Sequence, residues 1–175
     1  MSTSTLRDRQ RPLKQTYRQD PTAARVTSRA RATVDQQALT ATVPTWSGDL
    51  VAGLHPSTGG EGDLACSADV LLEALVACAG VTLAAVATSM GVRLHRAEVR
   101  AEGAWDARGT LAVDRDAPVG LTDVDLVVDV ELEPTPGADP EAEVATVARL
   151  LELTERYCVV ARTLADPPRV GVRRA

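Results

Sequence analysis

Cysteine is the residue type in this chain with the most distinctive chemistry, and it occurs at Cys66, Cys78 and Cys158. A thiolate is a strong nucleophile, and its oxidation product, a sulfenic acid, condenses with a second thiol to form a disulfide. Cys78 and Cys158 each lie in an apolar stretch with helical periodicity, 80 positions apart. Two helices packed on one sheet could bring these thiols together. From periodicity alone, a cysteine on such a stripe is usually a small hydrophobic core residue.

Other site chemistries have less support in the sequence. There is no CxxC motif and histidine occurs only at His55 and His95, so a zinc site of the usual spacing is not expected. A hydrolase that pairs Cys78 with His55 lacks an Asp or Asn beside the histidine to orient it. We therefore interpret His55 as a solvent-exposed loop residue. The glycines of residues 59–62 do not form a phosphate loop, because no Lys-Ser/Thr pair follows them.

The composition fits one globular domain. The chain has 175 residues, 45% of them hydrophobic, and a net charge of -5, which argues against a nucleic-acid-binding surface. The N-terminus lacks the apolar stretch of a secretory signal, so we expect a cytoplasmic, reducing location. Aromatic residues make up only 2% of the chain and Phe is absent, which suggests that part of the core lies at a subunit interface.

Residues 70–90 are almost entirely apolar or small and approach the length of a membrane-spanning helix. Glu73 interrupts the stretch and alanine dominates over leucine, so we expect no membrane span. The stretch is better interpreted as a helix buried in protein on all sides. Glu73 would then need a partner, either Arg156 or an arginine of another subunit.

The pattern of the first 66 residues predicts an arm, a hairpin and a long loop. Residues 1–21 are polar and basic; residues 5–18 could form a short surface helix, although we favour a solvated arm. Alternation predicts strands over residues 24–34 and 38–43, joined by a turn at residues 35–37. Residues 46–66 read as a long loop.

The remaining residues predict two principal helices among strands. Ser67 is a candidate N-cap for a helix that ends at Gly91, and Asp139 for one that continues to residue 165 with Cys158 on its buried stripe. Strands are expected over residues 92–105, 110–113, 121–133 and 169–173. The acidic face of residues 121–133 could be neutralised by a stripe of Arg25, Arg29 and Arg31. The fold class is thus α+β, with a mainly antiparallel sheet over residues 22–175.

Two segments make the chain similar to a known family. The stretch from Ser67 to Thr82, with Cys78 inside it, and the motif Glu155-Arg-Tyr-Cys158-Val-Val160 resemble the OsmC and organic-hydroperoxide-resistance superfamily, in particular its OsmC-like branch. The resemblance covers most of residues 22–173. It implies an intertwined homodimer with each site at the subunit interface, and a thiol-dependent peroxidase that reduces organic hydroperoxides in oxidative stress defence.

The resemblance also assigns roles to residues. Cys78 would be the peroxidatic thiolate and Cys158 the resolving thiol, and an external dithiol, lipoyl-type in part of the family, would reduce the disulfide. No bound cofactor or metal is expected. An activating arginine would come from the N-terminal hairpin, where Arg25, Arg29 and Arg31 are candidates.

Two features of the sequence bear on this assignment, and one alternative function stays open. The family usually has Pro-Glu where this chain has Ser67-Ala68, and the nearby acid, Asp69, falls on the opposite helix face from Cys78 if it is helical. Cys66 is either structural or an alternative resolving thiol. The alternative function is a non-catalytic protein that holds a small apolar ligand between the helices of the dimer, with structural cysteines.

Overall fold

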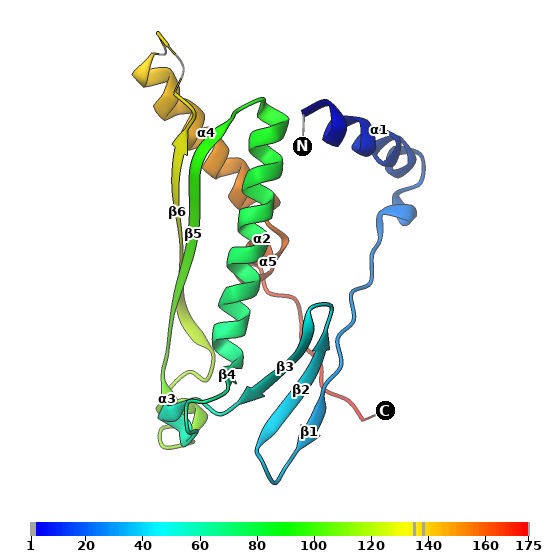
Figure 1. Ribbon diagram of the computed structural model, residues 1–175. Coiled ribbons are helices and arrows are strands. Elements are labelled where there is room, and N and C mark those ends of the chain that lie inside the picture. The colour runs from blue at the N-terminus through cyan, green and yellow to red at the C-terminus, as the bar shows by residue number, and fades with distance from the viewer. Residues whose placement is uncertain (1–2, 135, 138, 175) are drawn as a thin grey trace. The chain divides into compact units, whose positions relative to one another are not determined.

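A computed structural model describes residues 3–134, 136–137 and 139–174, and it combines helices with antiparallel strands, as the sequence predicts (Figure 1). The helices are α1 (Thr3–Gln19), η1 (Pro21–Ala24), η2 (Pro56–Thr58), α2 (Ser67–Met90), α3 (Ala107–Thr110), α4 (Pro140–Tyr157) and α5 (Val159–Ala165). The strands are β1 (Thr33–Asp35), β2 (Thr40–Thr45), β3 (Gly48–Gly53), β4 (Ala65–Cys66), β5 (Leu94–Trp105) and β6 (Leu121–Leu132).

The chain divides into two compact units. The first unit comprises residues 1–23, 74–100 and 126–175, and the second comprises residues 24–73 and 101–125. Both cysteines of the predicted pair, Cys78 and Cys158, belong to the first unit. Cys66, His55 and the three arginines of residues 25–31 belong to the second.

The sheet of the second unit has the order β1-β2-β3-β4. β1 and β3 flank β2 in antiparallel register, with Thr33 opposite Thr42 and Val43 opposite Leu50, whereas β3 pairs with β4 in parallel. The long loop predicted over residues 46–66 is therefore wrong in part, because it contains β3 and β4. Its strand signal was weak because glycine begins and ends β3, and Gly48 adopts φ +127° in the turn after β2.

The strand predicted over residues 24–34 is also wrong for most of its length. Residues 25–32 form neither helix nor strand, and only residues 33–35 pair as β1. The alternation in this segment is between arginine or threonine and small residues, so neither face supplies a large apolar surface to bury. The turn after β1 is as expected, since the Asp35 carboxylate accepts hydrogen bonds from the N–H groups of Gln37 and Ala38 at 2.8 and 3.1 Å.

Two other predicted strands do not form. Residues 107–110 form the short helix α3, capped by the Asp106 carboxylate, which accepts a 2.9 Å hydrogen bond from the N–H of Arg108; this cap competes with the strand expected over residues 110–113. Residues 169–173 lack strand pairing, and Val170 and Val172 are exposed. The N-terminal segment, in contrast, is helical as α1 rather than an unstructured arm.

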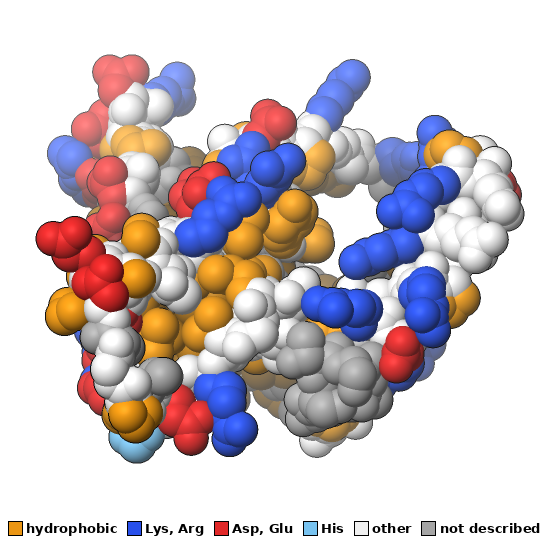
Figure 2. Space-filling model, turned by 90° about the horizontal axis from the view of Figure 1, so that it is seen from above, with side chains coloured by type: hydrophobic (Ala, Val, Ile, Leu, Met, Phe, Trp, Pro, Cys, Tyr) orange, Lys and Arg blue, Asp and Glu red, His pale blue; other side chains and the backbone are white. Residues whose placement is uncertain are grey.

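The helix predicted from Ser67 is confirmed as α2, and Gly91 ends it with φ +75°. By length and composition this helix could cross a membrane, but one of its faces is part of the protein core. The expectation of burial on all sides is wrong for the single chain: Val81 is 73% exposed and Leu71 39%. Hydrophobic side chains are accordingly visible at the surface (Figure 2).

The core of the first unit lies between α2, α4 and the strand pair β5–β6. Leu83, Val86 and Ala87 of α2 contact Leu150 of α4, and partly buried side chains of β5 and β6, among them Val128, pack against them. Along β6 the predicted alternation holds from Val124 to Leu132 except at Asp129, which is partly buried like its neighbours. The apolar pattern therefore positions α2, the helix that carries Cys78, against the first unit's sheet.

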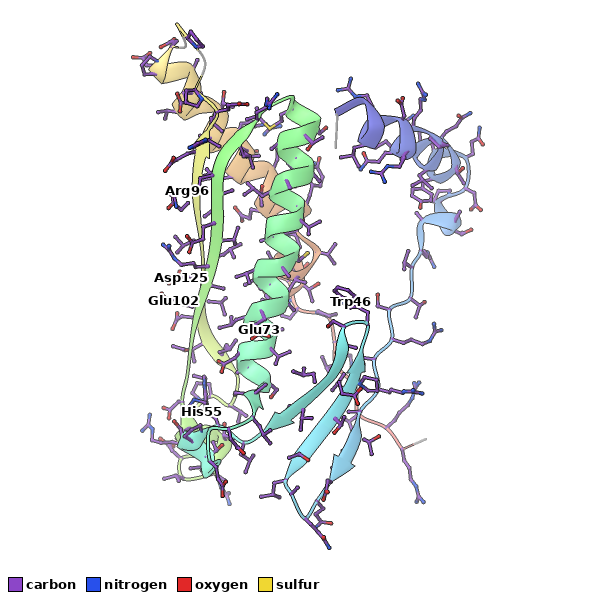
Figure 3. The ribbon with its side chains drawn as sticks, in the orientation of Figure 1. Trp46, His55, Glu73, Arg96, Glu102 and Asp125 are labelled. Carbon is purple, nitrogen blue, oxygen red and sulfur yellow. The ribbon has the colours of Figure 1, made fainter. Side chains whose placement is uncertain are left out.

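The acidic face of β6 is neutralised from the neighbouring strand. Arg96 of β5, labelled in Figure 3, donates hydrogen bonds of 2.8 Å to both Asp129 and Glu131, and Arg93 pairs with Glu133. β5 and β6 are neighbouring strands, so a charged side chain of one can reach opposite charges on the other. Arg25, Arg29 and Arg31, the stripe suggested from sequence, are exposed residues of the other unit.

Leu150→Ala tests whether this core holds the first unit together. Leu150 is 0% exposed, so the truncation leaves a cavity and is expected to lower the free energy of unfolding by about 2–5 kcal/mol, measured by urea denaturation. Val144→Ala on the same helix is the matched control, because Val144 is 71% exposed and its truncation should change stability by less than about 0.5 kcal/mol. Equal effects of the two substitutions would contradict the assignment of the core.

Candidate active site

Cys158 lies at the junction of two helices. It ends α4 and caps α5, with an extended backbone (φ −71°, ψ 109°) that interrupts the helix. Its sulfur accepts a hydrogen bond from the N–H of Ala161 at 3.5 Å, and its side chain is fully buried. The single helix predicted through residue 165 is therefore wrong. The break frees the N–H groups of the first turn of α5, which have no partner within their own helix.

The freed N–H groups are used by the other cysteine. Cys78 is a partly buried residue of α2, and the pKa of its thiol is lowered by the hydrogen-bonding influence of the Val160 and Val159 backbone and of the Cys158 and Thr82 side chains. The structure thus brings the two thiols within hydrogen-bonding reach of each other, although they are 80 positions apart. This is the juxtaposition on which a disulfide between them depends.

The surroundings shift the pKa values of the two thiols in opposite directions. Burial raises the pKa of Cys78, but hydrogen bonds from Val160, Cys158, Val159 and Thr82 outweigh it, and the net pKa is lower than that of an ordinary cysteine. Burial also raises the pKa of Cys158, and its hydrogen bond and charge interaction with Cys78 raise it further. Cys78 is therefore the more readily ionised thiol of the two, and Cys158 keeps its proton to higher pH.

The predicted accessory residues are not part of this hydrogen-bonded group. Asp69 is helical and exposed, and nine positions along α2 place it on the opposite helix face from Cys78. Arg25, Arg29 and Arg31 are exposed in the irregular segment of the second unit. Their role as activating residues stays a prediction.

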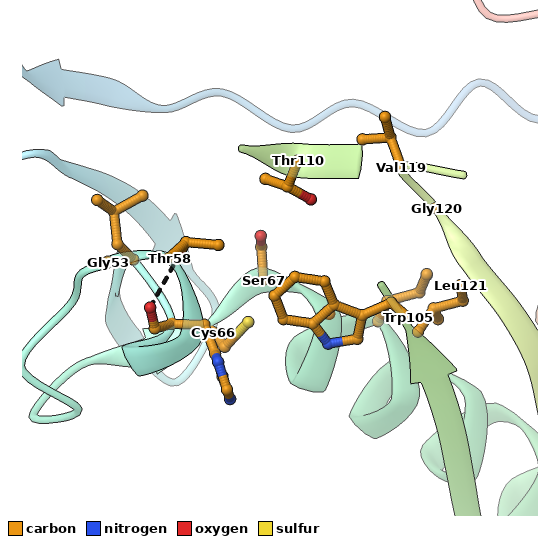
Figure 4. Close-up of a pocket in the computed structure, with 13 residues that line it drawn as sticks. Gly53, Thr58, Cys66, Ser67, Trp105, Thr110, Val119, Gly120 and Leu121 are labelled. Atoms are coloured by element: carbon orange, nitrogen blue, oxygen red, sulfur yellow. Dashed lines mark hydrogen bonds between the residues drawn. The ribbon is translucent and has the colours of Figure 1, made fainter. Parts of the chain in front are cut away.

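Cys66 and His55 line a separate cavity within the second unit. The cavity has a volume of about 440 Å³ and includes Ser67, Trp105 and Thr110 in its walls (Figure 4). His55 is partly buried rather than a freely exposed loop residue, and its ring meets the Trp105 indole edge-on with centroids 5.3 Å apart. The Nδ1 of His55 accepts a 3.0 Å hydrogen bond from the N–H of Ser57, so a neutral imidazole carries its proton on Nε2.

The position of Cys66 agrees with its expected place at the start of α2. It is a free, partly buried thiol in β4, directly before Ser67. Glu73, for which a buried partner was expected, is exposed on α2 in the single chain (Figure 3). An exposed carboxylate is solvated by water, so Glu73 does not require an arginine partner within the described part of the chain.

Sequence reasoning missed the donors to the Cys78 sulfur. The N–H groups of Val159 and Val160 are unavailable in an uninterrupted helix, so their role follows only from the break at Cys158. Thr82 was visible in the sequence, because it lies four residues after Cys78 and hence on the same helix face.

The chain is similar to known proteins in sequence and in fold. A family model described as OsmC-like protein matches residues 60–173, which include both cysteines of the pair. No curated protein matches the chain.

Several solved structures share the fold. An OsmC-like protein from Mycoplasma pneumoniae has a TM-score of 0.62 at 13% identity, covering 81% of this chain and 89% of that one. An organic hydroperoxide resistance protein from Elizabethkingia anophelis has a TM-score of 0.60 at 16% identity, covering 82% and 92%. A Vibrio cholerae OsmC-like protein of unknown function has a TM-score of 0.60 at 14% identity, covering 78% and 94%.

Thr82→Val tests the origin of the lowered pKa of Cys78. Valine keeps the shape of threonine but cannot donate a hydrogen bond to the thiolate, so the pKa of Cys78 should rise and its alkylation by iodoacetamide should require a higher pH. The measurement is the alkylation rate as a function of pH. Thr88→Val is the control, because its hydroxyl donates to the carbonyl of Ala84 at 2.7 Å instead. An unchanged midpoint in Thr82→Val would refute the hydrogen-bond explanation.

Proposed function

Since the chain belongs to the OsmC-like family, we propose that it is a thiol-dependent peroxidase that reduces organic hydroperoxides through Cys78 and Cys158. The observation that carries the proposal is the contact between a thiol of lowered pKa and a second thiol that keeps its proton. The similarity to solved organic hydroperoxide resistance proteins supports a role in the response to stress.

The first step is attack by the Cys78 thiolate on the terminal oxygen of the hydroperoxide. An S–O bond forms and the O–O bond breaks, so the sulfur is oxidised to a sulfenic acid and the peroxide is reduced to an alkoxide, which takes a proton and leaves as the alcohol. A thiolate is required because the neutral thiol is a poor nucleophile. The N–H groups of Val159 and Val160 stabilise this thiolate before the substrate arrives.

The second step joins the two sulfurs. The Cys158 thiol loses its proton and attacks the Cys78 sulfur, a disulfide forms and water leaves. The contact between the side chains makes this step fast relative to over-oxidation of Cys78 by a second peroxide. An external dithiol, of the lipoyl type in the proposal, then reduces the disulfide by thiol–disulfide exchange and is itself oxidised to a disulfide.

This chain has Ala68 where the family usually has glutamate, and this difference concerns how the Cys78 thiol is activated. A carboxylate that orients an arginine is absent at this position, and Asp69 faces away from Cys78. In this chain the backbone donors of α5 support a lowered pKa of Cys78 without that carboxylate. Arg29 and Arg31 are proposed as additional activating residues, and Cys66 as a structural thiol.

We also propose that the protein is a cytoplasmic homodimer. α2 exposes a run of small and apolar side chains on one face, namely Ala74, Ala77, Val81 and Ala84, and a single chain does not cover it. A second copy of the same helix matches this face because small side chains allow close approach of two backbones. Burial of this face would also supply the apolar contacts that an aromatic-poor core lacks.

A second candidate function is binding of a small ligand without catalysis. The cavity beside His55 and Trp105 favours it, because concave sites with apolar walls and a few polar groups are typical of ligand binding. Native mass spectrometry of freshly purified protein would then show a bound molecule that is retained when the cysteines are replaced by serine.

Three serine substitutions test the peroxidase. Cys78→Ser should abolish consumption of cumene hydroperoxide in the presence of dihydrolipoate, because serine forms no comparable nucleophile at neutral pH. Cys158→Ser should stop turnover after one cycle and leave a Cys78 sulfenic acid that over-oxidises, visible as added oxygen atoms by mass spectrometry. Cys66→Ser is the control and should retain turnover. Full activity in Cys78→Ser would eliminate the proposal.

Ala77→Glu tests the homodimer. A carboxylate placed on the exposed apolar face of α2 would be buried without a partner in a dimer, so the variant should sediment as a monomer where the wild type sediments as a dimer. Ala107→Glu in α3, which does not belong to this face, serves as the charge-matched control. A wild-type protein that sediments as a monomer at micromolar concentration would contradict the homodimer.

A further inference from the structure

The cavity of about 440 Å³ beside His55 lies within the second unit, whereas Cys78 and Cys158 belong to the first. Its walls come from parts of residues 53–58 and 105–121, from Cys66, and from Ser67, Ala68 and Leu71 of α2. None of these residues belongs to the face of α2 that we assign to the homodimer. The volume falls within the range of small-molecule sites. A ligand in this cavity would therefore use no residue of the thiol pair or of the proposed dimer face.

The lining of the cavity carries no charge. Among the described residues that line it, none is Lys, Arg, Asp or Glu, and aliphatic surface comes from Leu54, Leu71, Val119 and Leu121. The His55 ring is neutral, because its Nδ1 accepts a hydrogen bond from the N–H of Ser57. An ionised ligand would leave water for this cavity without meeting an opposite charge, and that transfer costs free energy. The lining thus favours a neutral ligand.

The half-buried polar groups of the cavity are donors. Within the described part of the chain, neither the Nε2–H of His55 nor the Nε1–H of Trp105 has a hydrogen-bond acceptor. Neither group can accept a hydrogen bond, since each nitrogen carries its proton. Ser67 and Thr110 are exposed, and Figure 4 shows both around the same space as Trp105. A ligand that satisfies the inner donors needs an oxygen with lone pairs, and a carbonyl group supplies one.

The donor and a flat apolar wall are held together. The His55 and Trp105 rings pack against each other with centroids 5.3 Å apart and an interplanar angle of 82°. Each ring therefore restricts the other, so little conformational freedom is lost when a ligand contacts both. The indole is also the largest apolar surface in the lining, and an aromatic ring packs favourably on such a surface.

We propose that this cavity binds a small neutral carbonyl compound with an aromatic ring. The carbonyl oxygen accepts a hydrogen bond from the Nε2–H of His55, and the ring packs on the Trp105 indole. The inference rests on the second candidate function, ligand binding, and names the class of ligand. It does not depend on the reaction of Cys78.

Acetophenone is the probe for the site, and the indole N–H signals in a ¹H–¹⁵N correlation spectrum report its binding. Acetophenone should shift the Trp105 signal and leave that of Trp46 unchanged, because Trp46 is 99% exposed and lies outside the cavity. Trp46→Phe assigns the two signals. Benzoate has nearly the same shape but is an anion, so it should bind at least about tenfold more weakly. An unshifted Trp105 signal, or equal affinity for benzoate, overturns the proposal.

His55→Phe tests the hydrogen bond, because it keeps an aromatic ring and removes the donor. Affinity for acetophenone should fall about five- to tenfold, the effect of one hydrogen bond. Affinity for α-methylstyrene, in which a CH₂ group replaces the carbonyl oxygen, should not change. His95→Phe is the matched control, since His95 is exposed on β5 and does not line the cavity. Equal losses for the two probes in His55→Phe would mean a structural role only and would refute the assigned hydrogen bond.

Two further outcomes separate this proposal from the functions proposed above. Cys78→Ser should bind acetophenone as the wild type does, and loss of binding in that variant would refute a site independent of Cys78. Native mass spectrometry shows whether a molecule is purified with the protein. A molecule retained by a protein whose Trp105 signal does not respond to acetophenone would keep ligand binding as a function and refute the carbonyl class.

Discussion

The interruption of the helix at Cys158 is the constraint on which the candidate site depends. If residues 140–165 formed one continuous helix, the N–H groups of Val159 and Val160 would bond to carbonyls one turn earlier. The extended backbone at Cys158 makes them the first N–H groups of α5 instead, and they reach the Cys78 sulfur. The non-helical conformation of Cys158 thus makes two N–H groups available to the Cys78 thiolate. Cys158 itself provides the second sulfur of the pair.

This arrangement gives the two thiols different pKa values although both lie in apolar surroundings. Burial alone would raise the pKa of both and make both inert. Cys78 has four donors against this effect, whereas Cys158 has fewer and also meets the negative charge that develops on Cys78. The hydrogen bond between the sulfurs therefore lowers the pKa of Cys78 and raises that of Cys158. A thiol of lowered pKa and a partner of raised pKa therefore follow from their positions.

Those parts of the fold with a clear apolar pattern could be predicted from the sequence. A long apolar run between Ser67 and Gly91 marks α2, alternation marks β6, and Asp139-Pro140 marks the start of α4. β3 was missed because glycine dilutes its pattern, and the break at Cys158 was missed because the flanking residues are ordinary helix formers. For the site, spacing and family resemblance indicated the cysteine pair. The backbone donors could not be predicted, because they depend on where a helix stops.

The place of Cys78 on α2, among several small residues, fits the role of reactive thiol that we propose for it. Ala79, one residue later, is 0% exposed, so a thiol there would be closed to a peroxide. Ala77, one residue earlier, is exposed on the face that the single chain leaves uncovered. Rotation by about 100° per residue places Cys78, which is partly buried, between these two faces. A nucleophile needs both burial and access, since stabilisation of the thiolate requires fixed donors and the attack requires a path for the substrate.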